Sequence, residues 1–216
     1  MYKELINEIF DNFANTLSSR NRFLAEDGLR YIFFSEMLNI DGNTNNYILE
    51  QPYDVSITKY SSLFKSNIKN ISQELDLLYS GDNEKIAFEF KYYKSNQLND
   101  GKKNGGETKR CGAVFSDILR LNLIDKVDNR FLVYATESEM FNYKSINKLY
   151  DDLLSNDNLS FDLNDLKVFS KTFYDVAFKS FSKYPQSKTK ININKCYSKQ
   201  ISINGKETYI FVFEIK

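Results

Sequence analysis

The amino-acid sequence predicts an α/β fold in which helices flank a mixed central sheet. Three observations support this prediction. Residues 2–38 carry apolar side chains at helical spacing, the middle of the chain holds two apolar runs joined by a short turn, and helix-like and strand-like segments alternate after them. Apolar residues make up 42% of the 216 residues, which is enough to fill one buried core. We therefore expect a single domain over residues 1–216.

The N-terminal part is expected to form two helices and a strand. Apolar side chains recur every three or four residues over 2–18 and over 23–38, as on one face of a helix. The second helix should end at the cluster Asp41-Gly42-Asn43. Residues 47–49 then predict a short strand. Residues 53–70 are compatible with a loop, a helix or an insertion.

Two apolar runs in the middle of the chain predict a β-hairpin. Residues 73–79 and 85–93 have the character of strands, and the turn between them contains glycine. Side chains two residues apart on a strand point to the same face, so Glu89 and Lys91 share a face that Phe88 and Phe90 do not. If the hairpin pairs in register, Asp76 lies beside Glu89. Two carboxylates and an amine then converge on one patch.

Further elements are expected after the hairpin. Residues 94–109 are polar and contain glycine, which indicates a surface loop. Helical spacing returns over 111–124 and over 137–154, with a strand at 130–135 between them. The C-terminal part should add two strands, at 191–197 and 208–215.

The absence of histidine excludes several kinds of active site. A Ser-His-Asp triad, a Cys-His pair and a His-ligated zinc ion all require it. The two cysteines, Cys111 and Cys196, are too few for a structural zinc site and are expected as reduced thiols. A metal would therefore be held mainly by carboxylates, which favours Mg²⁺ or Mn²⁺.

The hydropathy pattern predicts a cytoplasmic protein, and the charge balance bears on how the protein would meet nucleic acid. The 29 basic and 29 acidic residues argue against a protein that coats nucleic acid non-specifically, but a local basic groove remains compatible with them. No run reaches the roughly 18 apolar residues of a membrane span, so no membrane contact is expected. The N-terminus lacks the apolar core of a signal peptide.

The patch of Asp76, Glu89 and Lys91 suits phosphodiester hydrolysis. The two carboxylates and the Phe90 carbonyl oxygen are candidate ligands of a metal, which would offset phosphate charge and lower the pKa of a bound water. Lys91 is a candidate to orient or help deprotonate that water and to offset charge in the transition state. The alternative is that this Glu-x-Lys pair lies on a solvated strand face, as such pairs commonly do.

Asp76 followed by Glu89-Phe90-Lys91 resembles the signature of the PD-(D/E)xK nuclease superfamily, although Leu75 stands where the signature has proline. The resemblance covers about residues 20–136. It implies a restriction-endonuclease-like αβββαβ core, with 137–216 as a C-terminal extension. It also implies a Mg²⁺-dependent endonuclease that cuts DNA more often than RNA. A compact single domain without the helicase or partner modules of many repair enzymes favours a restriction or phage-defence role over repair.

The resemblance also implies an extra acidic residue from the helix before the sheet. Glu26 is the candidate, and Glu50, at the end of the first strand, is a second one. The alternative reading is that Glu26 or Asp27 merely stabilises the positive end of its helix.

Basic residues that follow the Glu-x-Lys strand are candidates for phosphate contacts, because they should lie near the scissile bond. Arg120 is placed among them, although Asp117 and Arg120 would alternatively form an internal ion pair on a solvated helix face. The candidates for nucleic-acid binding are Lys94, Lys102, Lys103, Lys109, Arg110 and Arg120.

Three functions are compatible with these patterns. The first is a metal-dependent endonuclease, which the joint presence of Asp76, Glu89 and Lys91 favours. The second is a non-catalytic module with a nuclease-like fold that binds nucleic acid or protein. The third is an unrelated α/β protein whose charged strand face contacts a protein partner. A homodimer would supply the two active sites that two cuts in a duplex need.

Overall fold

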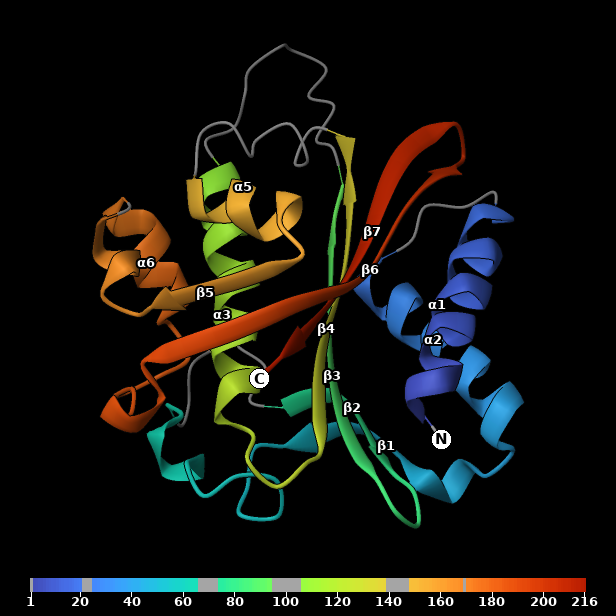
Figure 1. Cartoon of the computed structure of the whole chain (residues 1–216), viewed down its shortest axis with the longest axis horizontal. Coiled ribbons are helices and arrows are strands. Elements are labelled where there is room, and N and C mark those ends of the chain that lie inside the picture. The colour runs from blue at the N-terminus through green and yellow to red at the C-terminus, as the bar shows by residue number, and fades with distance from the viewer. Residues whose placement is uncertain (1, 21–24, 66–73, 95–105, 139–147, 169) are drawn as a thin grey trace.

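A computed structural model describes residues 2–20, 25–65, 74–94, 106–138, 148–168 and 170–216 of the chain (Figure 1). The strands are β1 (Tyr47–Pro52), β2 (Glu74–Ser80), β3 (Lys85–Tyr93), β4 (Asn129–Glu137), β5 (Asn158–Asp162), β6 (Lys190–Ile203) and β7 (Lys206–Ile215). They form one seven-stranded sheet in the order β1-β2-β3-β4-β7-β6-β5. Strands β3 and β4 are parallel, and every other neighbouring pair is antiparallel.

Helices cover both faces of this sheet. They are α1 (Tyr2–Ser18), α2 (Glu26–Asp41), α3 (Glu107–Leu123), α5 (Lys148–Ser155) and α6 (Lys171–Ala177). Figure 1 shows α1 and α2 on one face and α3, α5 and α6 on the other. Among the described helices, none is long and apolar enough to span a membrane.

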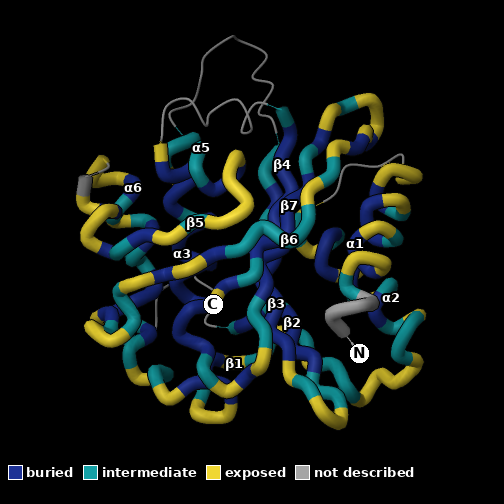
Figure 2. The backbone as a smooth tube through the Cα atoms, viewed as in Figure 1, coloured by how far each residue is buried: buried dark blue, intermediate teal, exposed yellow. Residues whose placement is uncertain are grey.

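The sheet separates two buried apolar layers. Beneath α1 and α2, Phe33 packs with Phe88 and Phe90, whereas Phe115 and Tyr134 belong to the layer beneath α3. The central strands β3, β4 and β7 are buried over most of their length (Figure 2). A polar side chain on either face of these strands must therefore find its partners inside the protein.

Helix α3 is the connection between the two parallel strands. A parallel pair needs a crossover, and α3 supplies it by running back over the sheet between β3 and β4. This path lays the middle of α3 over the face of β3 that carries Glu89. The topology thus places helix side chains directly against the predicted catalytic patch.

The predicted fold class is confirmed, because the chain forms a mixed sheet between helices. The order α2-β1-β2-β3-α3-β4 follows the helix and strand order expected from the sequence. Residues 137–154 differ from their predicted helix: β4 extends to Glu137, α5 begins at Lys148, and 139–147 lie outside the described residues. Strand β5 and helix α6 were not predicted, and β6 extends to Ile203, well beyond its predicted end.

Candidate active site

The site forms where strands β2 and β3 separate. Their described register ends at Leu77 opposite Phe88. Beyond this pair, the Phe90 N–H donates to Asp76 Oδ2 over 2.7 Å, and the next N–H on the same edge of β3 donates to Glu26 Oε2 over 3.4 Å. Buried N–H groups need acceptors, and here carboxylates provide them instead of a neighbouring strand. The hairpin therefore opens around two acidic side chains.

The two faces of β3 carry different chemistry, as the sequence predicts. On one face Phe88 and Phe90 pack on Phe33 of α2, with ring centroids 5.0 and 5.4 Å from the Phe33 ring. Glu89 and Lys91 lie on the other face, against α3. Glu89 is only 1% exposed, so the alternative of a solvated strand face is wrong for this pair.

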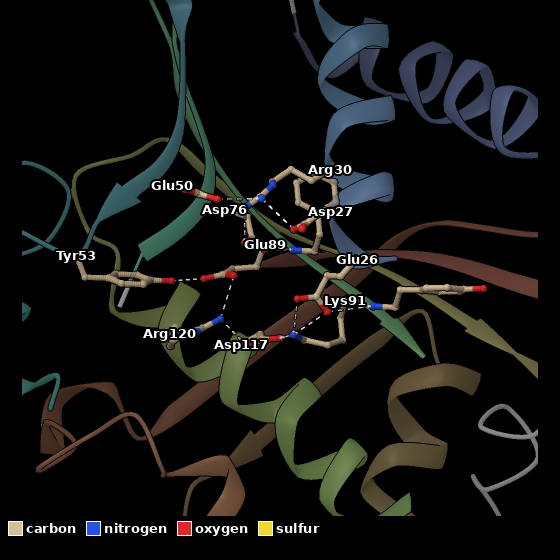
Figure 3. A network of polar contacts seen from close by, with 12 residues as sticks. Glu26, Asp27, Arg30, Glu50, Tyr53, Asp76, Glu89, Lys91, Asp117 and Arg120 are labelled. Atoms are coloured by element: carbon tan, nitrogen blue, oxygen red, sulfur yellow. Dashed lines mark hydrogen bonds and ion pairs between the residues drawn. The ribbon is translucent and has the colours of Figure 1, made fainter. Parts of the chain in front are cut away.

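A chain of alternating charges links β3, α3 and the start of α2 (Figure 3). Arg120 of α3 lies 3.0 Å from Glu89 and 2.7 Å from Asp117. The Lys91 amine lies 3.2 Å from Asp117 and 3.0 Å from Glu26. Each cation bridges two carboxylates. Glu89 and Lys91 of β3 are therefore fixed by Arg120 and Asp117, which lie three residues apart on one side of α3.

Arg30 of α2 pairs with a second set of carboxylates, at the solvent-exposed edge of the site. It lies 3.0 Å from Asp27, 3.0 Å from Glu50 and 3.3 Å from Asp76. The Asp27 and Glu50 side chains are 72% and 57% exposed, whereas the guanidinium beneath them is almost fully buried. Across both sets, six carboxylates pair with three cationic side chains. The site therefore carries an excess of negative charge.

Glu89 is held by Tyr53 as well as by Arg120. The Tyr53 hydroxyl donates to Glu89 Oε1, and Arg120 donates to Oε2. Burial raises the pKa of Glu89 well above its ordinary value; Arg120 opposes this, and the charge of Asp76 adds to it. Burial, and then the charge of Glu89, raises the pKa of Tyr53, so its hydroxyl remains a donor.

Lys91 and Glu26 shift each other's protonation. Burial alone would lower the pKa of Lys91, but Asp117 and Glu26 together outweigh it and raise that pKa. The pKa of Glu26 is also raised, first by burial and then by the charges of Asp117 and Asp76, with Lys91 opposing. Lys91 is therefore a firmly protonated donor, and Glu26 is a carboxylate with more basic character than usual.

Glu50 reaches the site through an unusual backbone conformation. Its φ of 56° lies in the left-handed region, which costs a non-glycine residue about 1–2 kcal/mol. It stands across from Asp76 between two regular pairs of β1 with β2, and its carboxylate accepts a bond from Arg30. The structure thus brings both acidic candidates, Glu26 and Glu50, to the site.

The basic candidates do not share one location. Arg120 is buried between Glu89 and Asp117, so the prediction that it binds nucleic acid is corrected: its guanidinium already serves these carboxylates. Arg110 lies over the Tyr93 ring at 5.7 Å and donates to the Lys94 carbonyl, and Lys109 is exposed. The candidates Lys102 and Lys103 lie outside the described residues.

Two residues of the site escaped the sequence interpretation. Arg30 follows Glu26 by four residues, a spacing that places both on one side of a helix and could have indicated it. Tyr53 lies in the segment 53–70, which shows no periodicity, and no local pattern relates it to Glu89. Its role follows from the path of the chain alone.

The oxygen ligands available to a metal are few. In the described part of the chain, no three acidic or cysteine side chains surround a common point in the manner of a metal cage. Asp76, Glu89 and the Phe90 carbonyl remain as a smaller donor set. Their hard oxygen atoms match Mg²⁺ or Mn²⁺ rather than softer ions.

Comparisons with protein-family models, with curated proteins and with solved structures found no match to this chain. The chemistry of the site must therefore be argued from this chain's own residues. Its main features are a separated hairpin, the buried Asp117 carboxylate beside the Lys91 amine, and the exposed carboxylates around Arg30.

Proposed function

We propose that this chain is a metal-dependent endonuclease that hydrolyses phosphodiester bonds, with DNA as the favoured substrate. One observation carries the proposal: Asp76, Glu89 and Lys91 converge where β2 leaves β3, and each is fixed by partners from other elements. Preorganised carboxylates beside a protonated amine are suited to a reaction that develops charge on phosphate oxygens. The resemblance to PD-(D/E)xK nucleases supports this chemistry, and we propose a role in restriction or phage defence with it.

Asp76 and Glu89 are the residues that would hold Mg²⁺ or Mn²⁺, together with the Phe90 carbonyl. Burial, and then the charge of Asp76, raises the pKa of Glu89, so a cation between the two carboxylates would relieve a real repulsion. Mg²⁺ needs only one or two protein carboxylates, because it keeps several waters. When bound, the ion would offset phosphate charge and lower the pKa of a water.

Glu26 is assigned as the acceptor of the proton from the attacking water. Burial raises its pKa, which makes it a better base than an ordinary carboxylate. In the reaction, the water oxygen bonds to phosphorus and its proton passes to Glu26. The bond between phosphorus and the leaving ester oxygen breaks, and that oxygen takes a proton from solvent.

Lys91 is assigned as a donor to the phosphate rather than as a base. Asp117 and Glu26 keep it protonated, so it cannot readily accept a proton near neutral pH. Of the two roles expected from the sequence, this favours orientation and charge compensation over deprotonation of the water. Its ammonium would stabilise the negative charge that develops on the phosphate oxygens.

One observation favours the second candidate function, a non-catalytic binding module with a nuclease-like fold. Glu89 is almost fully buried, and both of its oxygens already accept bonds from Tyr53 and Arg120. A metal must share these oxygens with their present partners. Each carboxylate offers about four lone-pair positions, so sharing is chemically feasible and the endonuclease remains the stronger proposal.

The test is a cleavage assay on plasmid DNA and on RNA with Mg²⁺ or Mn²⁺. We expect cleavage by the wild-type chain and none with EDTA. Lys91→Met should reduce cleavage by about 10²–10⁴-fold, as for the loss of a positioned acid–base or charged group. Lys91→Arg should not restore it, because guanidinium is larger and planar.

Lys59→Met is the matched control, because Lys59 also pairs with a carboxylate, Asp125, but lies on the surface. Circular dichroism establishes that each variant folds. Equal cleavage by the wild type and Lys91→Met would show that this site does not cut. Metal-independent binding of DNA, with no cleavage of either substrate, would instead support the non-catalytic module.

A further inference from the structure

The segment that follows α6 is attached directly to the site. Phe181 forms an isolated antiparallel bridge with Phe64, and their rings lie 5.4 Å apart. The Phe64 ring in turn stacks on Tyr53 at 4.5 Å, and the Tyr53 hydroxyl donates to Glu89. A short series of packed rings therefore connects the C-terminal part of the chain with a proposed metal ligand.

Further contacts fix both ends of this segment. The Tyr184 hydroxyl donates to the Leu119 carbonyl of α3 over 3.1 Å, and the Phe178 N–H donates to the Tyr174 carbonyl over 3.0 Å. The rings of Phe178 and Tyr184 also lie 6.0 Å apart. The backbone between these residues is thus held in place over α3.

Lys179 lies in this fixed segment, two residues before Phe181, whose ring packs on Phe64. Its side chain is half-buried, and within the described residues its amine takes part in no hydrogen bond or ion pair. Burial lowers its pKa, and the charges that act on it are those of Asp117, Arg120, Lys91 and Glu26. All of these belong to the network, so the amine of Lys179 lies within electrostatic range of it, in a segment that its neighbours hold over α3.

The negative charge of the site would repel a nucleic acid unless a further cation, such as Lys179, binds its phosphates. A nucleic acid brings phosphates toward a site where carboxylates outnumber cations, and this excess repels them. The cations Arg30, Lys91 and Arg120 already bridge carboxylates. A lysine without an internal acceptor is the group best placed to bind a phosphate, since its partial desolvation is then offset by a new ion pair.

We propose that Lys179 is a phosphate-binding residue that holds the backbone of the nucleic-acid substrate at the mouth of the site. This inference rests on the proposed function and extends it, because it assigns substrate positioning to a part of the chain outside the predicted core. Lys179 acts on binding of the strand, whereas Lys91 acts on the reacting phosphate and Glu26 on the attacking water. Nucleic acid should therefore run past the loop after α6.

The test measures binding of a short fluorescent DNA duplex by anisotropy in EDTA, where no cleavage occurs, over a series of KCl concentrations. Each phosphate contact contributes about 0.9 to the slope of log K against log salt. Lys179→Gln should weaken binding and reduce this slope by about 0.9. Lys179→Arg should retain the slope, since it keeps the charge.

Lys183→Gln is the matched control: Lys183 is an exposed lysine four residues away that loses the same charge. Equal slopes for Lys179→Gln and Lys183→Gln, with the wild type binding DNA, would overturn this inference and leave the proposed function standing. If the wild-type chain neither cuts nor binds DNA or RNA, this inference and the proposed function are both overturned. Thermal unfolding of each variant separates a lost phosphate contact from a lost fold.

Discussion

At Glu89, burial and charge compensation act against each other within one side chain. The carboxylate lies between β3 and α3, where an isolated charge would be very costly. Arg120 and Tyr53 provide the bonds that make ionisation tolerable, but burial still raises its pKa. Such an opposition between burial and a specific charge partner is typical of functional sites.

The raised pKa of Glu26 makes the stability of the fold depend on pH. Burial raises its pKa above 4.5, so the folded state holds the proton more tightly than the unfolded state. This contribution to stability is complete below pH 4.5 and is lost as the pH rises through the folded pKa. We expect the wild type to lose stability relative to Glu26→Gln between pH 4.5 and neutrality.

Urea unfolding of both chains at several pH values measures this difference. Glu8→Gln serves as control, because Glu8 is an exposed carboxylate on α1. If the free energy of unfolding changes with pH in the same way for Glu26→Gln and for the wild type, Glu26 has no raised pKa.

Local sequence patterns predicted the residues of one strand but not their partners. The shared face of Glu89 and Lys91 follows from the two-residue period of a strand, which requires no tertiary information. The Asp117–Arg120 pair was recognised from helical spacing, but its burial was not, because the elements that cover α3 come from much later in the chain. Tyr53 meets Glu89 across 36 residues, beyond the reach of any local pattern.

At the scale of elements, α3 can hold the charged network in place because it is closely packed on two sides. One side faces the sheet and the charged network, and the other faces α6. The contact with α6 depends on Gly112: a Cβ there would lie 2.8 Å from the Phe173 carbonyl oxygen and 3.0 Å from Val176 Cβ. The first of these atoms is backbone, so α6 would have to move.

Gly112→Ala should therefore destabilise the fold, by about 1–3 kcal/mol, as overpacking does. In an open helix position the same change would stabilise by about 0.5–1 kcal/mol, because alanine restricts the unfolded chain. The measurement is the free energy of unfolding in urea. Since α6 precedes Lys179, the variant should also weaken DNA binding.

Ala113→Gly, at the neighbouring half-buried position, provides the opposite exchange. It should cost about 0.5–1 kcal/mol through helix propensity alone, without an effect on DNA binding. Gly112→Ala and Ala113→Gly are then both destabilising, although they are opposite exchanges. Helix propensity alone cannot explain this result. A stabilising Gly112→Ala would contradict the close approach of α3 and α6.

The hairpin of β6 and β7 shows where an available signal was missed. Asn204 and Gly205 have φ values of 51° and 74°, as the tightest hairpin turns require, and Asn-Gly is the strongest short-range indication of such a turn. That dipeptide would have extended the predicted strand 191–197 to the turn. Strand β5 and helix α6 are short, and their amphipathic patterns are correspondingly weak.

At the scale of the whole molecule, the C-terminal part completes the sheet that holds the site. Strand β7 lies directly between β4 and β6, so β4 has a neighbour on both edges. The first and last parts of the chain also meet, since the ring of Phe10 in α1 lies 5.5 Å from Tyr197 of β6. Lys199 pairs with Asp11 nearby at 3.0 Å.

The core expected at about residues 20–136 should therefore not fold without the rest of the chain. A chain that ends at residue 136 would expose the edge of β4 and the ring of Phe115, which packs on Phe161 and Phe173 at 5.6 and 5.3 Å. Unpaired edges and exposed apolar rings favour aggregation over folding. The full chain should instead unfold in one transition.

Urea titrations followed by far-UV and near-UV circular dichroism test this expectation, because two-state unfolding gives coincident midpoints for both signals. The near-UV signal reports on tyrosines from every part of the chain, including Tyr53 near the site and Tyr197 on β6. Chain 1–136 should show no cooperative transition and should bind a dye for exposed apolar surface. A soluble chain 1–136 with its own sharp transition would mean that the predicted core is an independent unit. The contacts of β7 with β4 would then be an addition to the sheet and not a condition for it.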